Sequence, residues 1–289
     1  MKILVTGSHG FIGKSLVKRL KENDHDVIEV DKKNGIDLTS FEVVENLPDV
    51  DAIFHLAAYN GTKWFYEKPF DVVLDNTLPT INLLKRYASN LNLFVFAGTC
   101  ESYAGIHNLS DKFLPTDENV PLVISDVTNP RWSYGGSKIG NEVSVIAAHE
   151  QHGMNFQILR FHNVYGPDQI DHFFPEFIDR VKKGDFSLKG YSNTRSFLYI
   201  DDCIDYVLEL FGNPNSFNQV INIGSEDEIS IEKAAKMVLN LLNLKTELEL
   251  KKAPIGSVSR RLPDLKKLKL FTKKRNLISL EEGIKKLLL

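Results

Sequence analysis

Cysteine is scarce in this chain of 289 residues, and long apolar runs are missing from it. The two cysteines, Cys100 and Cys203, lie far apart and match neither a metal-binding nor a redox spacing. A reduced, cytoplasmic setting is therefore the simplest expectation. The longest apolar runs have the length of a strand, so we expect no membrane span. The first predicted strand begins at Lys2, which leaves no room for a signal peptide.

An excess of basic residues is missing as well. Lysine and arginine number 35 against 38 aspartates and glutamates, which gives a net charge of −3 at pH 7. No run rich in lysine and arginine stands apart as a tail, so nucleic acid is not an expected partner. The composition is 43% hydrophobic and 25% charged, which is typical of a globular protein with an ample core.

The most informative stretch lies at the start of the chain. Residues 2–6 form a short apolar run, as in a strand buried on both faces. Gly7, Gly10 and Gly13 follow, and apolar residues then recur with the period of a helix. In such a unit the first glycine permits a sharp turn, the second a close approach to a pyrophosphate, and the third close helix packing. The pattern predicts a dinucleotide site at the helix N-terminus.

Strands and helices are predicted to alternate through the first half of the chain. The strands lie at residues 27–30, 52–56, 93–97 and 156–160, and the main helices at residues 69–88 and 133–149. This alternation indicates a parallel sheet covered on both faces. We therefore expect an α/β fold with a Rossmann-type, doubly wound parallel sheet.

The pattern becomes less regular after residue 166. Further strands are expected at residues 196–200 and 219–223, and amphipathic helices at residues 231–242 and 280–288. The predicted cofactor-binding domain comprises residues 1–166 with a returning segment near 192–224, and a smaller, discontinuous substrate-binding domain comprises residues 167–191 and 225–289. A ligand would lie between them, at the C-terminal ends of the strands.

Asp31 ends the second predicted strand, about 20 positions beyond the glycine turn. An acidic residue there holds the ribose 2′-hydroxyl of NAD and disfavours NADP. Lys32 and Lys33 could soften this preference, because basic side chains can accept a 2′-phosphate. A carboxylate that only caps the strand end is the alternative interpretation.

Tyr134 and Lys138 are four positions apart on one face of a predicted helix. A lysine ammonium beside a phenol stabilises the phenolate and lowers the pKa of the tyrosine. Tyr134 is therefore a candidate base for a sugar hydroxyl and, in reverse, an acid. Thr99 follows the fourth predicted strand, and its hydroxyl would relay the proton. A threonine that only satisfies loop backbone is the alternative.

These residues resemble the extended short-chain dehydrogenase/reductases, and among them the nucleotide-sugar epimerase/dehydratase group. The likeness runs along the whole chain through Thr6-Gly7-x-x-Gly10-x-x-Gly13, Asp37-Leu38, His55-Leu-Ala-Ala58, Asn76, Thr99, Tyr134-x-x-x-Lys138, Arg160-Phe-His-Asn-Val-Tyr-Gly-Pro167, Arg195-Ser-Phe-Leu-Tyr-Ile-Asp-Asp202, Ile221-Asn-Ile-Gly224 and Arg260-Arg-Leu-Pro-Asp264. It implies NAD as the cofactor, a nucleotide-diphosphate sugar as the substrate, and a place in polysaccharide biosynthesis. It also implies a homodimer formed through the helices at residues 69–88 and 133–149.

The resemblance implies roles for the matching positions. Cofactor contacts would come from Gly7, Gly10, Phe11, Ile12, Gly13, Asp31, Asp37, Leu38, Leu56, Ala57, Ala58, Asn76, Tyr134 and Lys138. Substrate contacts would come from Thr99, Cys100, Asn163, Arg195, Arg260 and Arg261. The arginines would neutralise phosphate charge, unless they only form surface ion pairs. Asp201 and Asp202 are expected to be structural, in the first turn of a helix.

The matching residues identify the family more specifically than they identify the reaction. In this group NAD⁺ takes a hydride from C4 of the sugar while the tyrosine takes the O4 proton. We expect epimerisation through this transient oxidation, with Tyr134 as base, Lys138 tuning its pKa and Thr99 relaying the proton. Dehydratases of the family carry Asp-Glu after the hydroxyl residue, where this chain has Cys100-Glu101. Dehydration is therefore not expected, and Cys100 is expected to be an inert thiol unless its pKa is lowered.

Glu101 keeps other reactions open. It is compatible with decarboxylation of a nucleotide-linked glucuronate, or with epimerisation at a carbon acid with Glu101 as the base. It could also only orient substrate hydroxyls. A nucleotide-4-keto-sugar reductase and a non-catalytic Rossmann sensor are further alternatives, although a sensor needs no proton relay.

Two aromatic stretches have open roles. Residues 60–69 would cover the sugar or pack the lid that the smaller domain forms. Phe173, Phe174 and Phe177 would stack on the nucleotide base or, as is commoner at this spacing, pack in the core.

Overall fold

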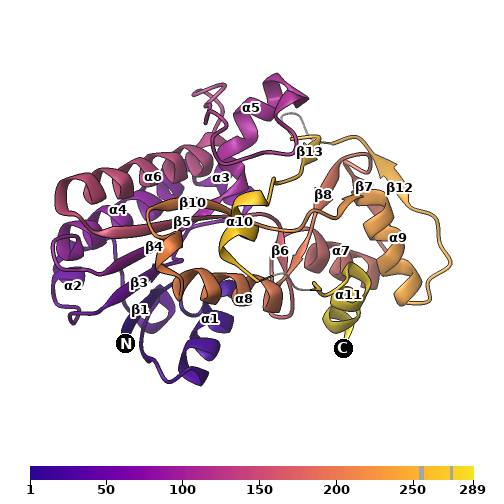
Figure 1. Ribbon diagram of the computed structural model, residues 1–289. Helices are drawn as coiled ribbons and strands as arrows, with labels where there is room; N and C mark the ends of the chain where they lie inside the picture. Colours follow the sequence, from indigo (N-terminus) through magenta and orange to yellow (C-terminus); the bar gives the residue numbers. More distant parts are fainter. Residues whose placement is uncertain (254–256, 274–275) are drawn as a thin grey trace.

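A six-stranded sheet, parallel at every pairing, is the central feature of residues 1–253, 257–273 and 276–289, which the computed structural model describes (Figure 1). In spatial order its strands are β10 (Gln219–Ile223), β5 (Asn155–Phe161), β4 (Leu93–Thr99), β3 (Ala52–His55), β1 (Lys2–Thr6) and β2 (Asp26–Val30). The predicted α/β, Rossmann-type fold is confirmed.

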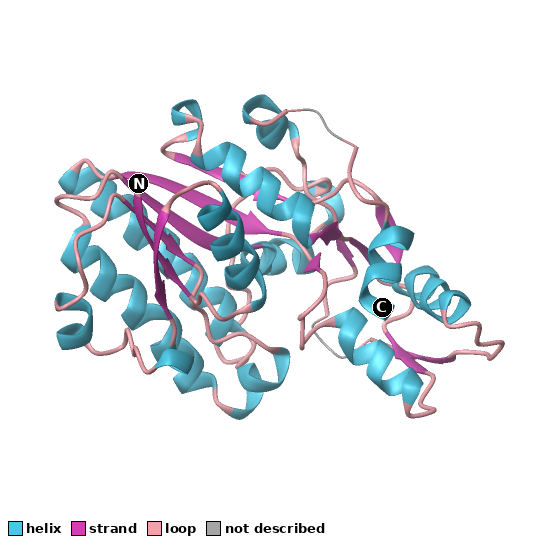
Figure 2. Cartoon of the chain, turned by 90° about the horizontal axis from the view of Figure 1, so that it is seen from below, coloured by secondary structure: helices cyan, strands magenta, loops and turns pink. Residues whose placement is uncertain are grey.

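Helices cover both faces of this sheet (Figures 1 and 2). One face carries α1 (Phe11–Glu22) and α8 (Ile200–Phe211), and the other carries α2 (Phe41–Glu45), α4 (Pro69–Tyr87) and α6 (Trp132–His152). Successive residues of a strand face opposite sides. Ile3 and Val5 therefore join the core beneath α1 and α8, whereas Leu4 joins the core beneath α4 and α6.

The C-terminal part of the chain builds smaller sheets beside the large one (Figure 1). A three-stranded sheet contains β11 (Glu228–Ser230), β8 (Thr194–Ser196) and β13 (Arg260–Arg261), and two pairs contain β7 (Ser187–Lys189) with β12 (Glu249–Lys251) and β6 (Val164–Tyr165) with β9 (Leu198–Tyr199). The accompanying helices are α7 (Phe173–Lys182), α9 (Ile231–Leu241), α10 (Lys266–Phe271) and α11 (Leu280–Leu288), and the short helices α3 (Thr62–Glu67) and α5 (Ala104–Leu109) belong to the first half of the chain.

One predicted strand divides into two elements. Residues 219–223 return to the large sheet as predicted, in parallel with β5. The single strand predicted at residues 196–200 is wrong, because β8 ends at Ser196, β9 begins at Leu198, and Ile200 already starts α8. The chain changes sheets at Phe197: β8 pairs with β11 and β13, whereas β9 pairs with β6. An apolar run carries no local signal of such a switch.

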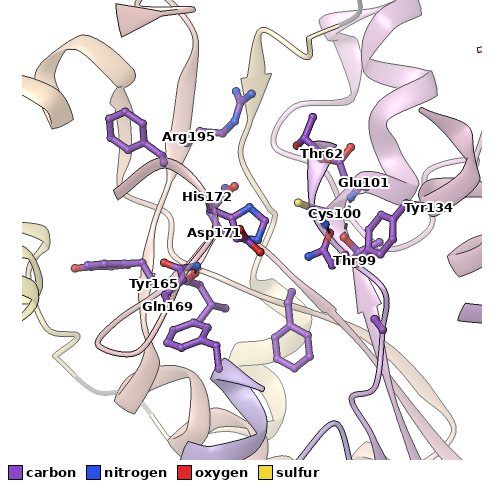
Figure 3. A pocket seen from close by; sticks show the side chains of 18 of the residues that line it. Thr62, Thr99, Cys100, Glu101, Tyr134, Tyr165, Gln169, Asp171, His172 and Arg195 are labelled. Carbon is purple, nitrogen blue, oxygen red and sulfur yellow. Dashed lines mark hydrogen bonds between the residues drawn. The ribbon is translucent and has the colours of Figure 1, made fainter. Parts of the chain in front are cut away.

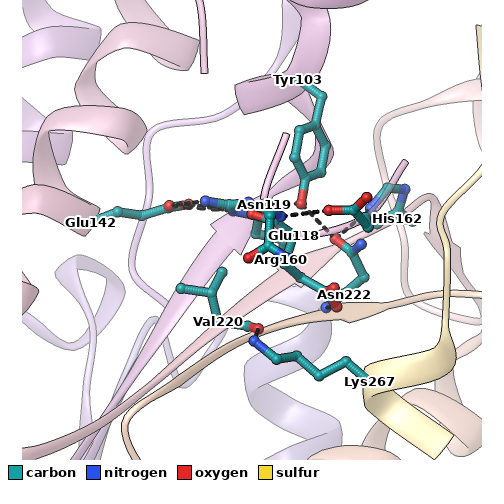
Figure 4. Close-up of polar contacts among 10 residues, drawn as sticks. Tyr103, Glu118, Asn119, Glu142, Arg160, His162, Val220, Asn222 and Lys267 are labelled. Carbon is teal, nitrogen blue, oxygen red and sulfur yellow. Dashed lines mark hydrogen bonds and ion pairs between the residues drawn. The ribbon is translucent and has the colours of Figure 1, made fainter. Parts of the chain in front are cut away.

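A buried ion pair fixes α6 to the sheet (Figure 4). Arg160 on β5 and Glu142 on α6 have side chains that are only 5% exposed, and their N–O distances are 2.6–3.2 Å. Arg160 also donates to the Tyr103 hydroxyl at 2.7 Å. A Cβ on Gly98 of β4 would lie 3.0 Å from Arg160 Cγ and 3.1 Å from Glu142 Oε1. The missing side chain at Gly98 therefore lets the pair sit against the end of β4.

The sequence also raised expectations about membrane spans, metal sites and the two cysteines. Within the described ranges, no helix is long and apolar enough to cross a membrane. The same residues contain no cluster of three or more histidine, cysteine or acidic side chains that could hold a metal. Cys100 and Cys203 are both free, buried thiols.

Candidate active site

A cavity of about 740 Å³ lies at the C-terminal edge of the large sheet (Figure 3). Its wall includes the glycine turn after β1, the ends of β3, β4 and β5, the start of α6, and residues of β8 and β13. The large sheet and the smaller sheets therefore both contribute to it. This is the edge at which ligands bind in open parallel sheets.

The glycine turn is built to bring backbone close to a ligand. Gly7 has a φ of +68°, and a Cβ there would lie 2.8 Å from the Ala57 backbone nitrogen. A Cβ on Gly13 would lie 2.0 Å from the Gly7 carbonyl oxygen, so close packing of α1 requires glycine. Gly10, Phe11 and Ile12 join them in the cavity wall. The turn and the N-terminus of α1 form a cradle that suits the pyrophosphate of a dinucleotide.

The segment after β3 forms a neighbouring part of the wall. Leu56 and Ala58 line the cavity, and the Ala57 nitrogen donates to the Thr6 hydroxyl at 3.1 Å. Asn76 lies behind this segment and does not line the cavity. Its side-chain amide accepts from the Tyr59 nitrogen at 2.9 Å and donates to the Tyr59 carbonyl at 3.2 Å. In this structure Asn76 therefore supports the wall from α4.

Asp31 joins the end of β2 to the glycine turn. Its carboxylate accepts from the His9 nitrogen at 3.0 Å and from the Lys33 nitrogen at 2.9 Å. This is the capping arrangement considered above, and a carboxylate has further lone pairs for a ribose hydroxyl. Lys32 forms ion pairs with Asp37 at 3.5 Å and Asp75 at 2.9 Å.

Asp37 and Leu38 lie outside the cavity wall. The Asp37 carboxylate accepts hydrogen bonds from the backbone and hydroxyl of Thr39, at 3.0 and 2.9 Å. Leu38 is 4% exposed in the core, and its carbonyl accepts from the Asn82 amide at 2.9 Å.

Thr99, Tyr134 and Lys138 all lie in the cavity wall. Thr99 is the last residue of β4, and its hydroxyl accepts from the Glu101 nitrogen at 3.2 Å, which leaves the hydroxyl proton available to a second partner. Burial raises the pKa of Tyr134, and its interaction with the Thr99 side chain opposes part of that rise. Tyr134 is therefore a neutral phenol, and it needs neighbouring groups that stabilise the phenolate in order to ionise.

Lys138 is nearly fully buried on the same helix. Its ammonium donates to the Ala97 carbonyl at 2.9 Å and lies 6.0 Å from the centre of the Tyr134 ring. Burial lowers the pKa of Lys138 to about 8, while the negative charge of Glu142 opposes this shift. Lys138 therefore remains mostly cationic near neutral pH and close enough to favour a phenolate.

Glu101 is held between two arginines. Its Oε1 lies 2.6 Å from Arg261 Nη1, and its Oε2 lies 2.9 Å from Arg131 Nη2. Although burial alone would raise it, these two guanidinium groups lower the pKa of Glu101 to about 2. A carboxylate with so low a pKa is a weak base near neutral pH.

This ion-pair arrangement predicts a specific pH dependence of stability. Because the pKa of Glu101 is lowered in the folded protein, its contribution is present above its unfolded pKa of about 4.3 and is lost as the pH falls toward 2. We expect the difference in free energy of unfolding between wild type and Glu101→Gln to be largest above about pH 5. Urea unfolding between pH 3 and pH 7 measures it, and a constant difference across that range would contradict the assignment.

Of the two neighbouring arginines on β13, the fold brings only Arg261 to the cavity. Arg260 faces away and binds Glu228 through its Nε at 2.9 Å and its Nη2 at 2.8 Å. The Nε of Arg261 is buried without a hydrogen-bond partner among the described residues. Such a donor suits an anionic ligand oxygen.

Arg195 and Asn163 complete the predicted substrate contacts in the wall. Arg195 donates to the carbonyls of Thr194 at 2.7 Å and Val258 at 2.8 Å. Burial lowers the pKa of Arg195 to about 9, and the positive charge of Arg261 adds to the effect. Asn163, with a φ of +38°, donates its amide to the Ser196 carbonyl at 2.9 Å.

Cys100 lies in the same wall, with its sulfur 3.9 Å from Arg261 Nη1. Burial raises the pKa of Cys100 despite that neighbour. A thiol with a raised pKa is not a base at neutral pH, which matches the inert role expected for it.

Sequence reasoning missed several residues of this wall. Arg131 comes one helical turn before Tyr134, and this i, i+3 spacing was the available signal. Thr62, Asp171 and His172 also line the cavity (Figure 3), but Thr62 begins the short helix α3 and the other two come from a loop, in each case without a recognisable motif. His172 has a φ of +79°, which is unusual for a residue other than glycine.

The aromatic stretches have mixed positions. Phe174 and Phe177 are 1% and 0% exposed in the main core, as the packing interpretation predicted, although Phe174 also lines the cavity with Phe173. Within residues 60–69, Phe65 and Trp64 both line the cavity; Phe65 is buried against Tyr134, and Trp64 is only partly buried. This segment therefore packs against α6 and also contributes to the cavity wall.

Comparisons with known proteins agree with this geometry. Residues 3–224 match the profile of the NAD dependent epimerase/dehydratase family. A Methanocaldococcus jannaschii protein provisionally named UDP-glucose 4-epimerase is 32% identical, covering 98% of this chain and 96% of its own. A UDP-N-acetyl-alpha-D-glucosaminuronate decarboxylase of Bacillus cytotoxicus is 29% identical, covering 98% and 95%.

A solved structure extends the likeness to three dimensions. UDP-glucuronic acid 4-epimerase from Bacillus cereus, solved with UDP-glucuronic acid and NAD, has a TM-score of 0.87 and 26% identity, and the match covers 99% of this chain and 98% of the other. The chain therefore belongs to the NAD-dependent epimerase/dehydratase family, and its cofactor is NAD.

Proposed function

We propose that the protein is a nucleotide-sugar epimerase that acts through transient oxidation at C4 of the sugar. The observation that carries this proposal is that Thr99, Tyr134 and Lys138 share one cavity with the glycine turn and with Arg195 and Arg261. Arg195 and Tyr134 lie on opposite sides of that cavity (Figure 3). A phosphate-binding wall and a proton-transfer wall would thus hold the two ends of one nucleotide sugar.

The proposed steps use the residues in named roles. The glycine turn and the N-terminus of α1 would hold NAD⁺, which when bound would supply the hydride acceptor for C4 and the hydride that returns to the other face of the 4-keto sugar. Tyr134 accepts the O4 proton as a phenolate and gives it back as a phenol, with Thr99 sharing the proton. Lys138 stabilises the phenolate through its charge. General acid–base catalysis of this kind contributes about 10²–10⁴-fold to a rate.

The arginines would hold the diphosphate. Arg261 is buried and Arg195 is partly buried in the wall, and guanidinium groups bind phosphate oxygens through two parallel donors. Asn163 adds a polar contact. Arg131, Arg195 and Arg261 carry three positive charges, and Glu101 offsets one of them. The remaining charge of these four groups, about +2, is opposite in sign and similar in size to the charge of about −2 on a diphosphate.

The state of Glu101 favours hydride return at C4 over epimerisation at a carbon acid. Removing a proton from C3 or C5 needs a base beyond Tyr134, and Glu101 is tied to Arg131 and Arg261 with its pKa lowered to about 2. Inversion at C4 needs no second base, because the sugar only has to turn before the hydride returns. We therefore propose inversion at C4, because this reaction does not need Glu101 as a base.

Decarboxylation of a nucleotide-linked uronic acid is the second candidate. Two observations favour it: Arg131 lies next to Glu101 in the wall, where its forked guanidinium suits a sugar carboxylate, and a decarboxylase is among the relatives that match the whole chain. In that reaction the C5–C6 bond of the 4-keto uronate breaks, CO₂ leaves, C5 gains a proton, and the hydride returns to C4.

One experiment separates these candidates. The purified protein with NAD⁺ is incubated with a panel of UDP-, GDP-, CDP- and TDP-sugars that includes uronates, and the products are resolved by mass. A new compound of unchanged mass supports the epimerase, and loss of CO₂ from a uronate supports the decarboxylase. If neither forms, the epimerase proposal is wrong for these donors, and a repeat with NADH and 4-keto sugars tests the reductase.

We also propose that two chains pair through α4 and α6. Phe70, Val73 and Ile81 on α4 and Val143 and Ile146 on α6 are 38–71% exposed, although the two helices pack together. Apolar side chains that remain exposed in this way mark interaction surfaces. We expect a dimeric mass by light scattering, and Val143→Glu should shift it to the monomer. A monomeric wild-type protein would contradict the proposal.

A further inference from the structure

The phenol of Tyr134 is covered by another aromatic ring. The rings of Phe65 and Tyr134 lie 5.0 Å apart between centroids and are inclined by only 11°. Phe65 is 6% exposed, Tyr134 is 7% exposed, and Val72 of α4 completes the buried cluster. Phe65 belongs to α3, whereas Tyr134 belongs to α6, so the stacking joins two elements that are far apart in the sequence.

The segment that carries Phe65 is fixed on both sides. Before α3, the backbone of Tyr59 is held by the Asn76 side chain through two hydrogen bonds of 2.9 and 3.2 Å. Within α3, Trp64 packs on Tyr59 with a centroid distance of 5.8 Å, and the ammonium groups of Lys63 and Lys68 lie 5.0 and 5.7 Å from the Trp64 ring. Phe65 is thus an anchored neighbour of the phenol.

From this geometry we infer that Phe65 is a positioning residue, which fixes the plane of the Tyr134 ring and keeps water from one of its faces. The inference rests on the proposed role of Tyr134 in proton transfer. A phenol that can turn or be hydrated on this face would lose its alignment with Thr99 and with a substrate hydroxyl, and alignment errors of about 1 Å can cost about 10²-fold in rate. Phe65 also lines the cavity, and the effect inferred here is the one that its ring has through Tyr134.

The charged and titratable groups that face the phenol define what removing Phe65 should do. The Lys138 ammonium on the same helix lies 6.0 Å from the centre of the Tyr134 ring, where its positive charge favours the phenolate. The charges of Glu101 and Cys100, which follow β4, disfavour it. From α3 the phenol meets the apolar Phe65. Because burial is the largest influence that raises the pKa of Tyr134, admitting water at this face should lower that pKa.

The test is a titration that needs no sugar. Tyrosine labelled with ¹³C at Cζ reports ionisation of each phenol by NMR in the NAD⁺-loaded protein, and Tyr134→Phe identifies the signal. We expect Tyr134 to ionise at a pH at least one unit lower in Phe65→Ala than in wild type, within the range where circular dichroism shows a folded protein. Phe65→Leu keeps an apolar cover and should stay near wild type. Identical titration in wild type and Phe65→Ala would overturn the inference.

A matched control separates this effect from general loss of stability. Phe217 is a partly buried phenylalanine that precedes β10. It therefore lies at the N-terminal ends of the parallel strands, whereas the cavity lies at their C-terminal ends. Phe217→Ala should reduce stability without moving the Tyr134 titration, and a shift of similar size in this variant would also overturn the inference. Once a substrate is known, Phe65→Ala should lower kcat by at least 10-fold and change KM by less than about 3-fold. The titration decides the role of Phe65 even if the sugar panel yields no product.

Discussion

Tyr134→Phe is expected to lower kcat by about 10²–10⁴-fold on whichever nucleotide sugar the panel identifies. The substitution removes one oxygen and leaves the ring, so the stacking on Phe65 and the shape of the cavity should be kept. The O4 proton then has no acceptor of suitable basicity, because Glu101 is paired with two arginines. Steady-state kinetics with unchanged NAD content measures the loss.

Tyr87→Phe supplies the control for this experiment. The Tyr87 hydroxyl donates to the Pro48 carbonyl at 2.8 Å, and the side chain is 3% exposed away from the cavity. Its loss should reduce stability by about 0.5–1.5 kcal/mol and leave turnover intact. If Tyr134→Phe retained more than a tenth of wild-type turnover, the proposed proton transfer would be wrong.

Arg160→Met is expected to destabilise the protein by about 3–5 kcal/mol, the largest stability change that we predict. The methionine leaves the Glu142 carboxylate in a site where its side chain is 5% exposed, with no cation to compensate it. The Tyr103 hydroxyl and the Glu118 carbonyl lose the hydrogen bonds that Arg160 donates at 2.7 and 3.1 Å. Urea denaturation measures the change in free energy of unfolding.

The matched variant carries both Arg160→Met and Glu142→Met. It removes the Glu142 carboxylate together with the Arg160 guanidinium. Replacing a buried ion pair by apolar side chains of similar size often changes stability little. We expect the double variant to recover part of the loss, since the bonds to Tyr103 and Glu118 remain broken. A double variant less stable than Arg160→Met alone would show that the unpaired carboxylate is not the cause.

The same pair connects stability to the site. Glu142 is one helical turn beyond Lys138, and Arg160 packs against Gly98, the residue before Thr99. Movement of α6 relative to β4 would therefore separate Tyr134 from Thr99. The ion pair therefore affects the geometry of the site although it does not line the cavity.

Sequence patterns predicted what depends on local order. Apolar runs and helical periods located the parallel sheet, and the i, i+4 spacing placed Tyr134 and Lys138 on one helix face. Thr99 was expected near them because parallel strands end at one edge. These inferences needed only the periods of helix and strand and the rule for where ligands bind.

Other features depended on contacts between distant residues. The choice between Arg260 and Arg261 follows from the register of β13 against β8, because successive strand residues face opposite ways. Glu101 is paired with Arg131 and Arg261, which are 30 and 160 positions away. No local spacing indicates such pairs, so the sequence suggested Glu101 as a candidate base without showing that two guanidinium groups pair with its carboxylate.

The position of β10 has a consequence for how the protein is made. This strand pairs with β5 at the edge of the large sheet, yet it is the last strand of that sheet along the chain. During synthesis, residues 155–161 will therefore leave the ribosome well before their partner at residues 219–223. At about 5–20 residues per second, the open edge of β5 waits for several seconds, a time in which an unpaired strand can join another chain. Expression at a high level, which raises the concentration of nascent chains, should therefore favour mispairing at the open edge of β5.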